Sequence, residues 1–198
     1  MKLLISNYFE AIGGIPLIQN LKSHSLWCSV EAKGIQQTWK ESYNYESGEF
    51  QVVVENEGVP IMVTEGNKIE AVRKVNKQEQ KLGSDELAIL HTTIILVPEI
   101  LFLEEEYIRS ISDVSLTILD DENILKFKRH PYFYTYIFSI SDGLKKEVRL
   151  SDVSDSAISL TIRYSDWRDV NGLLYPFVQD MVNERMESRR RVIIVNSG

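Results

Sequence analysis

The chain has 198 residues, of which 43% are hydrophobic and 10% aromatic, a composition that can bury a substantial core and differs from that of disordered segments. This length is within the range of one β-sandwich or open barrel, so we expect a single domain over residues 1–198. The net charge of -7 and the pI near 5.1 would repel a phosphate backbone, which argues against nucleic acid as a partner.

The single cysteine, Cys28, excludes an internal disulfide and a metal site built from several cysteines. The first five residues run directly into polar Ser6 and Asn7, so we find no signal-peptide core, and no apolar run reaches the roughly 20 residues of a membrane helix. Removal of a signal peptide before expression would leave the same pattern, so the cellular compartment stays open.

Helical spacing of apolar residues predicts a short amphipathic helix at the start, which ends at the Gly13-Gly14 pair because glycine tolerates the left-handed conformation. A second short helical piece is expected between Pro16 and His24. Over residues 25–75 the apolar period changes to two, which predicts five strands joined by tight turns.

The middle of the chain predicts a helix that Ser84 and Asp85 cap and whose apolar face continues past Pro98 to Leu101. Proline should kink or split this helix, because it lacks the backbone N–H that a helix interior needs. Since the segment is apolar nearly all round, we expect it to be buried on more than one side.

Alternating patterns return over residues 114–195, and the total reaches about ten or eleven strands. The basic run Arg189 to Arg191 is interpreted as a turn that enters the last strand. The predicted fold is therefore mainly β (α+β): a curved antiparallel β-sheet or half-barrel covered by an N-terminal helix and a central apolar helix. Where helices cover a curved sheet imperfectly, a hydrophobic cavity is left between them.

Catalytic and metal-binding patterns are absent from the sequence. His24, His91 and His130 fall in separate elements, and none belongs to an HExxH pair or a nucleophile elbow. His24 and Cys28 could supply two zinc ligands, but no second pair at suitable spacing accompanies them. We therefore expect a protein that is not an enzyme and that uses neither a metal nor a cofactor.

Two local sequences and the order of the elements carry a resemblance to a known family. The first is Tyr8 to Gly14 (YFEAIGG), and the second is Tyr164 to Gly172 (YSDWRDVNG), followed by Pro176. With these segments the chain resembles the LolA/LolB-like outer-membrane lipoprotein-sorting proteins of Gram-negative bacteria. The resemblance implies a half-barrel with an apolar cavity for acyl chains, in the periplasm or at the outer membrane. The chain has no lipobox cysteine, and we carry over no functional residue.

The predicted function is non-catalytic binding and carriage of a hydrophobic ligand, a lipid or an acylated lipoprotein, in a cavity between sheet and helices. The alternative is a protein-interaction or scaffold domain of the cell envelope with a filled core. We expect a monomer whose partners are a lipid or acyl chain and an envelope protein. The resemblance favours the periplasm, while the sequence also allows the cytoplasm.

The predicted ligand contacts are the residues that alternate inward on the strands, together with three apolar residues of the central helix. They are Trp39, Tyr43, Phe50, Val52, Tyr134, Phe138, Leu160 and Ile162 from strands, and Leu90, Ile94 and Leu101 from the helix. Each of them could also simply pack the core.

Overall fold

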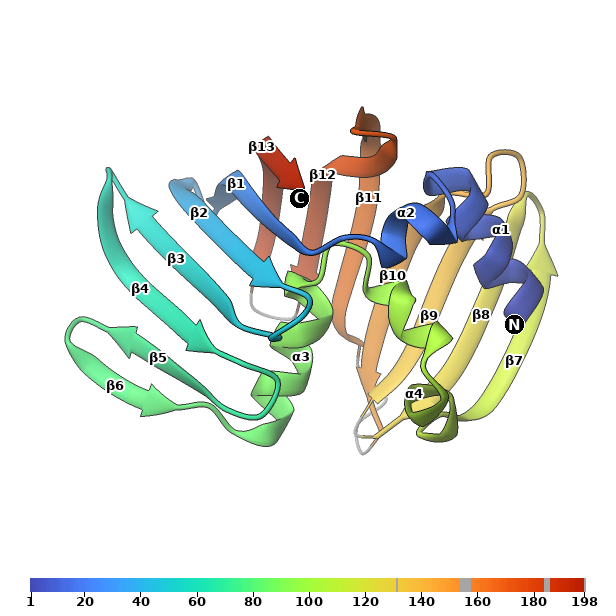
Figure 1. Cartoon of the computed structure of the whole chain (residues 1–198), viewed down its shortest axis with the longest axis horizontal. Coiled ribbons are helices and arrows are strands. Elements are labelled where there is room, and N and C mark those ends of the chain that lie inside the picture. The colour runs from blue at the N-terminus through green and yellow to red at the C-terminus, as the bar shows by residue number, and fades with distance from the viewer. Residues whose placement is uncertain (131, 154–157, 184–185, 198) are drawn as a thin grey trace. The chain divides into compact units, whose positions relative to one another are not determined.

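The computed structural model describes residues 1–130, 132–153, 158–183 and 186–197 (Figure 1). The chain divides into two compact units. Unit 1 comprises Met1–Gln19 and Glu99–Arg189, and unit 2 comprises Asn20–Pro98 and Arg190–Gly198. That the whole chain acts as one domain stays a prediction.

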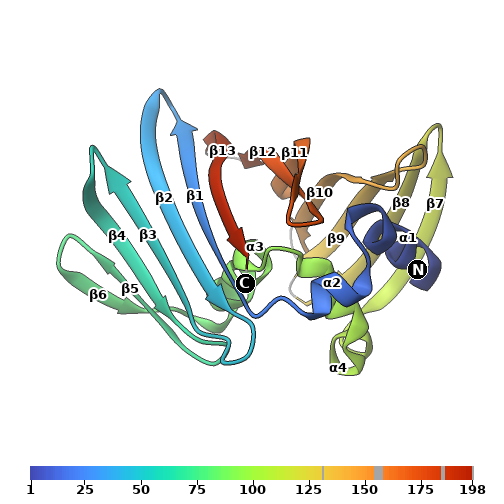
Figure 2. The same cartoon turned by 45° about the horizontal axis from the view of Figure 1, so that its top comes forward.

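The described strands form an antiparallel sheet of thirteen strands in the order β6-β5-β4-β3-β2-β1-β13-β12-β11-β10-β9-β8-β7 (Figure 2). This arrangement confirms the predicted fold class, although the strand count exceeds the expected ten or eleven. Strand β6 (Gln78–Lys81) was missed because its sequence is polar throughout and all four of its residues are exposed. Without an apolar period, an edge strand gives no signal in the sequence.

Unit 2 contains a meander of six strands and one helix. Its strands are β1 (Ser23–Ala32), β2 (Ile35–Asn44), β3 (Phe50–Asn56), β4 (Val59–Gly66), β5 (Ala71–Val75) and β6. The helix is α3 (Ser84–Ile94), and most of β13 (Met186–Ser197) also belongs to this unit. Helix α3 lies against the sheet through His91, whose ring stands edge-on to Phe50 at 5.4 Å.

Unit 1 contains the remaining strands and four helical segments. The helical segments are α1 (Lys2–Ile12), α2 (Ile15–Gln19), the 3-10 helix η1 (Pro98–Leu103) and α4 (Glu105–Arg109). The strands are β7 (Ser112–Leu119), β8 (Glu122–Arg129), β9 (Tyr132–Ser139), β10 (Lys145–Asp152), β11 (Ile158–Val170) and β12 (Leu173–Asn183). No helix in the described ranges is long and apolar enough to cross a membrane.

The central segment is split as predicted, because α3 ends at Ile94 and Pro98 begins the separate helix η1. The predicted cap is displaced by one residue. Gly83 is the N-cap of α3, and its backbone N–H donates to the Glu86 carboxylate at 3.2 Å. The single predicted lid therefore consists of two pieces, one of which lies in unit 2 and the other almost wholly in unit 1.

The two segments that carry the family resemblance meet at the C-terminal end of α1. Gly13 has a φ of 127°, and a Cβ atom at this position would lie 2.4 Å from the carbonyl oxygen of Gly172. Only glycine combines this backbone conformation with such a close approach. The Gly13-Gly14 helix stop and the Asn171-Gly172 turn are therefore one structural feature.

Candidate ligand-binding site

The inner face of unit 1 is a continuous surface of aromatic and aliphatic side chains. Cross-strand register aligns Phe127 on β8, Tyr134 on β9, Leu150 on β10 and Leu160 on β11 in one row. The rings of Phe127 and Tyr134 stack with centroids 5.0 Å apart. This row provides an apolar floor on which helices can pack.

Two separate helical covers lie on this floor. Helix α1 contacts it through Tyr8, whose ring centroid is 5.3 Å from that of Phe138. The segment η1 contacts it through Phe102, which stands edge-on to Phe127 at 5.5 Å and to Tyr136 at 6.0 Å. The sheet of unit 1 is therefore covered by two elements from distant parts of the sequence.

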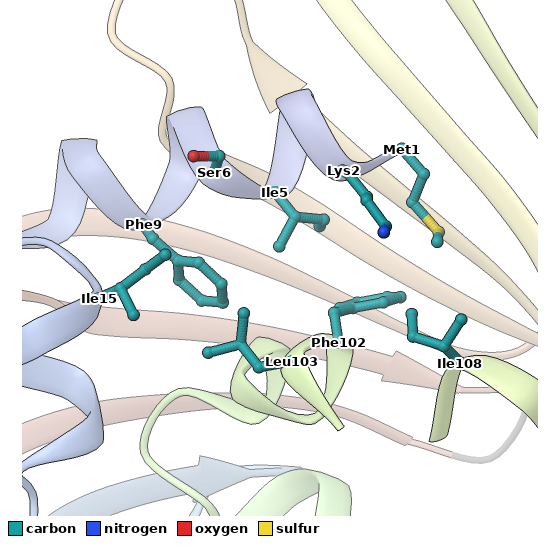
Figure 3. A pocket seen from close by; sticks show the side chains of 9 residues that line it. All are labelled: Met1, Lys2, Ile5, Ser6, Phe9, Ile15, Phe102, Leu103 and Ile108. Atoms are coloured by element: carbon teal, nitrogen blue, oxygen red, sulfur yellow. The ribbon is translucent and has the colours of Figure 1, made fainter. Parts of the chain in front are cut away.

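A pocket of about 280 Å³ lies between these covers (Figure 3). Its walls come from α1 and the start of α2 on one side, and from η1 and α4 on the other. The lining residues are Met1, Lys2, Ile5, Ser6, Phe9, Ile15, Phe102, Leu103 and Ile108. All of them except Lys2 and Ser6 are apolar, so the pocket suits an apolar guest.

A buried ion pair ties η1 to the sheet next to this pocket. The Lys145 Nζ atom lies 2.6 Å from Oε1 of Glu99, and the two side chains are 4% and 0% exposed. The Lys145 ammonium also stands 4.4 Å from the ring centroid of Tyr164 and 5.7 Å from that of Tyr8. Burial, and then the charge of Glu99, raise the pKa of Tyr8 well above its ordinary value, so this phenol stays protonated.

The position of Glu99 bears directly on the pocket wall. Residues three apart in a 3-10 helix lie on the same side of it, and Phe102 follows Glu99 by three residues. The ion pair with Lys145 therefore fixes the turn that carries Phe102.

Unit 2 holds a second buried ion pair, within its sheet. The Arg190 guanidinium lies 2.8 Å from the Glu41 carboxylate, and its Nε donates to the Cys28 sulfur at 3.0 Å. Arg190 is thus a buried residue inside β13, so the interpretation of residues 189–191 as a turn was wrong. An inward charge in a strand is recognisable only when its partner Glu41, which is also inward, is known. Burial raises the pKa of the Cys28 thiol, so the thiol stays protonated near pH 7.

His24 is buried in unit 2 beside two tyrosines. Its ring stacks on Tyr43 with centroids 6.0 Å apart and lies 5.6 Å from Tyr45. Burial lowers the pKa of His24 to about 4, so the ring is neutral near pH 7. Among the residues that the structure describes, no group of three or more His, Cys, Asp or Glu side chains could hold a metal ion.

The predicted strand contacts do share the inner faces, as their cross-strand partners show. In unit 2, Tyr43 pairs with Phe50, and Val52 pairs with the inward Glu41. The other predicted residue of these strands, Trp39, is paired with buried Val54. The remaining predicted residues are Leu90 and Ile94 on α3, Leu101 on η1, and Tyr134, Phe138, Leu160 and Ile162 on the strands of unit 1. None of the eleven lines the pocket of Figure 3, and a role for them in ligand binding stays a prediction.

The sequence predicts the first helix only as a cover of the sheet, so it does not predict the residues that line the pocket. Its Leu4 and Tyr8 are buried, but so are Ile5 and Phe9, so the helix is apolar over two adjacent faces. An apolar surface that is wider than one packing contact requires also predicts the burial of the central helix. Applied to residues 2–12, it indicates a second contact on the side of Phe9.

Comparisons with known proteins show the fold. No protein-family model matches the sequence, and no curated protein matches it either. A DUF1329 family protein from Desulfovibrio piger is similar in structure with a TM-score of 0.65 at 8% identity, over 99% of this chain and 92% of that protein. The LolA superfamily protein NE2245 from Nitrosomonas europaea has a TM-score of 0.63 at 12% identity, over 97% and 91%.

A domain from Vibrio parahaemolyticus, assigned to outer membrane lipoprotein sorting, has a TM-score of 0.61 at 8% identity, over 88% of this chain and 85% of the domain. Identities this low bear on architecture alone. The chain has a LolA-like fold.

Proposed function

We propose that the protein carries a hydrophobic ligand, and that the pocket between α1–α2 and η1–α4 holds an apolar chain of that ligand. The observation that carries this proposal is the lining of the pocket, in which seven of the nine side chains, Phe9 and Phe102 among them, are apolar. Binding is non-covalent and is driven by the removal of apolar surface from water. No bond is made or broken in this function.

The size of the pocket suits reversible binding. Its volume of about 280 Å³ equals roughly nine water-sized spaces of ~30 Å³, and a methylene group is similar in size. Burial of about nine methylenes at ~0.8 kcal/mol each contributes roughly 7 kcal/mol, from which the entropy cost of association is subtracted. A carrier needs affinity of this moderate kind, because it must release what it binds.

The structural similarity supports a place in the cell envelope. One similar structure is a domain assigned to outer membrane lipoprotein sorting, and another is a LolA superfamily protein. We propose that this protein works in the periplasm, with a lipid or the acyl chain of a lipoprotein as ligand and an envelope protein as its source or acceptor.

The test is a titration with a fluorescent fatty-acid probe. Leu103 lines the pocket and is 40% exposed, so Leu103→Asp places a charge at the wall without burying it in the core. The matched control is Ile69→Asp, since Ile69 is 87% exposed in unit 2. We expect Leu103→Asp to weaken probe binding at least about tenfold and Ile69→Asp to leave it unchanged. Equal probe affinity in all three proteins would exclude the pocket as the site.

A second candidate function, protein interaction, is favoured by strand β7. All eight residues of this edge strand are exposed, among them Val114, Leu116 and Ile118. An apolar edge strand can accept a strand of a partner. Two results together would replace carriage by this function. The wild-type protein would bind no fatty-acid probe, and Leu116→Lys would abolish binding to an envelope protein that the wild type binds.

A further inference from the structure

The pocket contains one charged side chain, and that side chain is a cation. Lys2 lines the wall formed by α1, and Figure 3 shows its ammonium group turned toward the opposite wall at Phe102. The other polar lining residue, Ser6, lies one turn further along the same helix. The η1–α4 wall contributes only Phe102, Leu103 and Ile108. Both polar side chains of the pocket therefore lie on one wall, and the other wall is apolar.

Within the described residues, Lys2 forms no ion pair, because every ion pair there joins two other side chains. Acidic residues do follow Leu103 in the chain, but none of Glu104, Glu105 and Glu106 lines the pocket. Glu105 is paired with Arg109 at 2.8 Å. The charge that faces a guest is thus positive.

The volume limits the number of chains that enter. Ligand pockets usually measure about 300–1,000 Å³, and this pocket lies just below that range. The space for roughly nine methylenes holds one acyl chain of medium length or the inner part of a longer one. Two chains side by side would not fit.

We propose that the ligand is a single-chain amphiphile with an anionic head group, a carboxylate or a phosphate, which pairs with the Lys2 ammonium. The chain lies between Phe9 and Phe102, with its end toward Ile15. This inference rests on the proposed carriage of a hydrophobic ligand and adds the charge of the head and the number of chains. A carboxylate from a fatty acid and a phosphate from a lysophospholipid share the chemistry that Lys2 recognises.

The test compares ligands of one chain length and different heads. Decanoate, decyl phosphate, decanol and decyltrimethylammonium compete with the fluorescent probe at low salt for the wild type and Lys2→Glu. The control is Lys126→Glu, because Lys126 is exposed on β8 of the same unit, next to inward Leu125 and so on the opposite face. It makes the same change in net charge without touching the pocket.

We expect the wild type and Lys126→Glu to bind at least one anion about five- to tenfold more tightly than decanol, and Lys2→Glu to lose that preference. Decanol should bind all three proteins equally. A larger preference for decanoate than for decyl phosphate identifies the carboxylate as the head, and the reverse identifies the phosphate. Equal affinity for anions, alcohol and cation in the wild type would overturn the head-group inference and leave carriage intact. Failure of all four ligands to compete would overturn the proposed function itself.

Discussion

The two units cover their parts of the sheet in different ways, and the difference explains where the pocket lies. In unit 1 the buried pair of Lys145 and Glu99 joins a strand to the helical segment η1. In unit 2 the buried pair of Arg190 and Glu41 joins two strands. One pair fixes the cover to the sheet, whereas the other holds the sheet together.

The helical cover of unit 2 is held without a buried ion pair, since its link to the sheet through charge is the partly exposed pair of Glu86 on α3 and Arg73 on β5, 3.3 Å apart. The ring of His91 on α3 stands edge-on to both Phe50 and Tyr43, and the backbone N–H of Leu96, just after α3, donates to the Tyr45 hydroxyl at 3.2 Å. A single helix covers this face, whereas unit 1 has two covers that meet along a line. The pocket of Figure 3 lies along this line, where the two covers of unit 1 meet.

Loss of a buried charge should produce the largest effect. Lys145→Met leaves Glu99 buried without its partner, and we expect a loss of about 3–5 kcal/mol in the free energy of unfolding measured with urea. Arg190→Met should cost a similar amount in unit 2. The two variants should differ in ligand binding. Only Lys145→Met should also weaken binding of the fatty-acid probe, because it frees the turn that carries Phe102.

A double variant provides the control for this prediction. Lys145→Met with Glu99→Leu replaces the pair by apolar groups, so it should recover most of the lost stability. If Lys145→Met costs less than about 1 kcal/mol, the pair does not hold η1, and the distinction between the units fails.

The next effect is a pH dependence confined to unit 2. His24 has a pKa of about 4 in the folded protein and about 6.5 when unfolded, so the unfolded state binds the extra proton as the pH falls between these values. The stability present above pH 6.5 should fall by up to about 3 kcal/mol by pH 4. The variant His24→Phe should not show this fall in the free energy of unfolding, because it has no group that titrates at this position. Identical pH profiles of the two proteins in chemical denaturation would show that His24 is not buried as described.

Glycine substitutions should separate the units on a smaller scale. Gly13→Ala in unit 1 strains the backbone and places a Cβ atom against the Gly172 carbonyl, and we expect a cost of about 2 kcal/mol or more. Gly34→Ala in unit 2 has a positive φ but open space around it, so we expect about 1 kcal/mol. Thermal unfolding of both variants measures the difference. Equal costs would mean that the contact between α1 and the Asn171-Gly172 turn is unimportant.

The smallest effect is expected at the exposed edge of unit 1. Ile118 on β7 is 68% exposed, so Ile118→Thr should change the free energy of unfolding by less than about 0.5 kcal/mol. The equivalent change at buried Leu125, Leu125→Thr on neighbouring β8, should cost several times more. A large loss at Ile118, seen by urea denaturation, would indicate that β7 is covered in solution.

Much of this architecture could be predicted from the sequence, because alternation identifies each strand and also the face it buries. Tyr43, Phe50 and Tyr134 lie on inner faces as their spacing indicates. Alternation cannot distinguish a residue that packs under a helix from one that lines a pocket. The pocket brings together Phe9 and Phe102, which are 93 residues apart in the chain, and local patterns contain no information on such a contact.

The buried ion pairs were the other feature that the sequence could not predict. Glu99 belongs to an apolar segment and Lys145 to a strand with charged neighbours, so neither residue alone indicates a buried ion pair. Only the folded arrangement shows that Lys145 points inward beside Phe138, its cross-strand partner.

The most direct test of the pocket is a titration of isoleucine-methyl-labelled protein with decanoate, followed by NMR. Ile5, Ile15 and Ile108 line the pocket between the two covers, whereas Ile94 of the central helix and Ile162 of β11 are among the ligand contacts predicted from the sequence. We predict saturable shifts of the first three methyl signals, with Ile94 and Ile162 unaffected. Shifts confined to Ile94 and Ile162 would contradict the pocket as the binding site and place the ligand under the inner faces of the sheet.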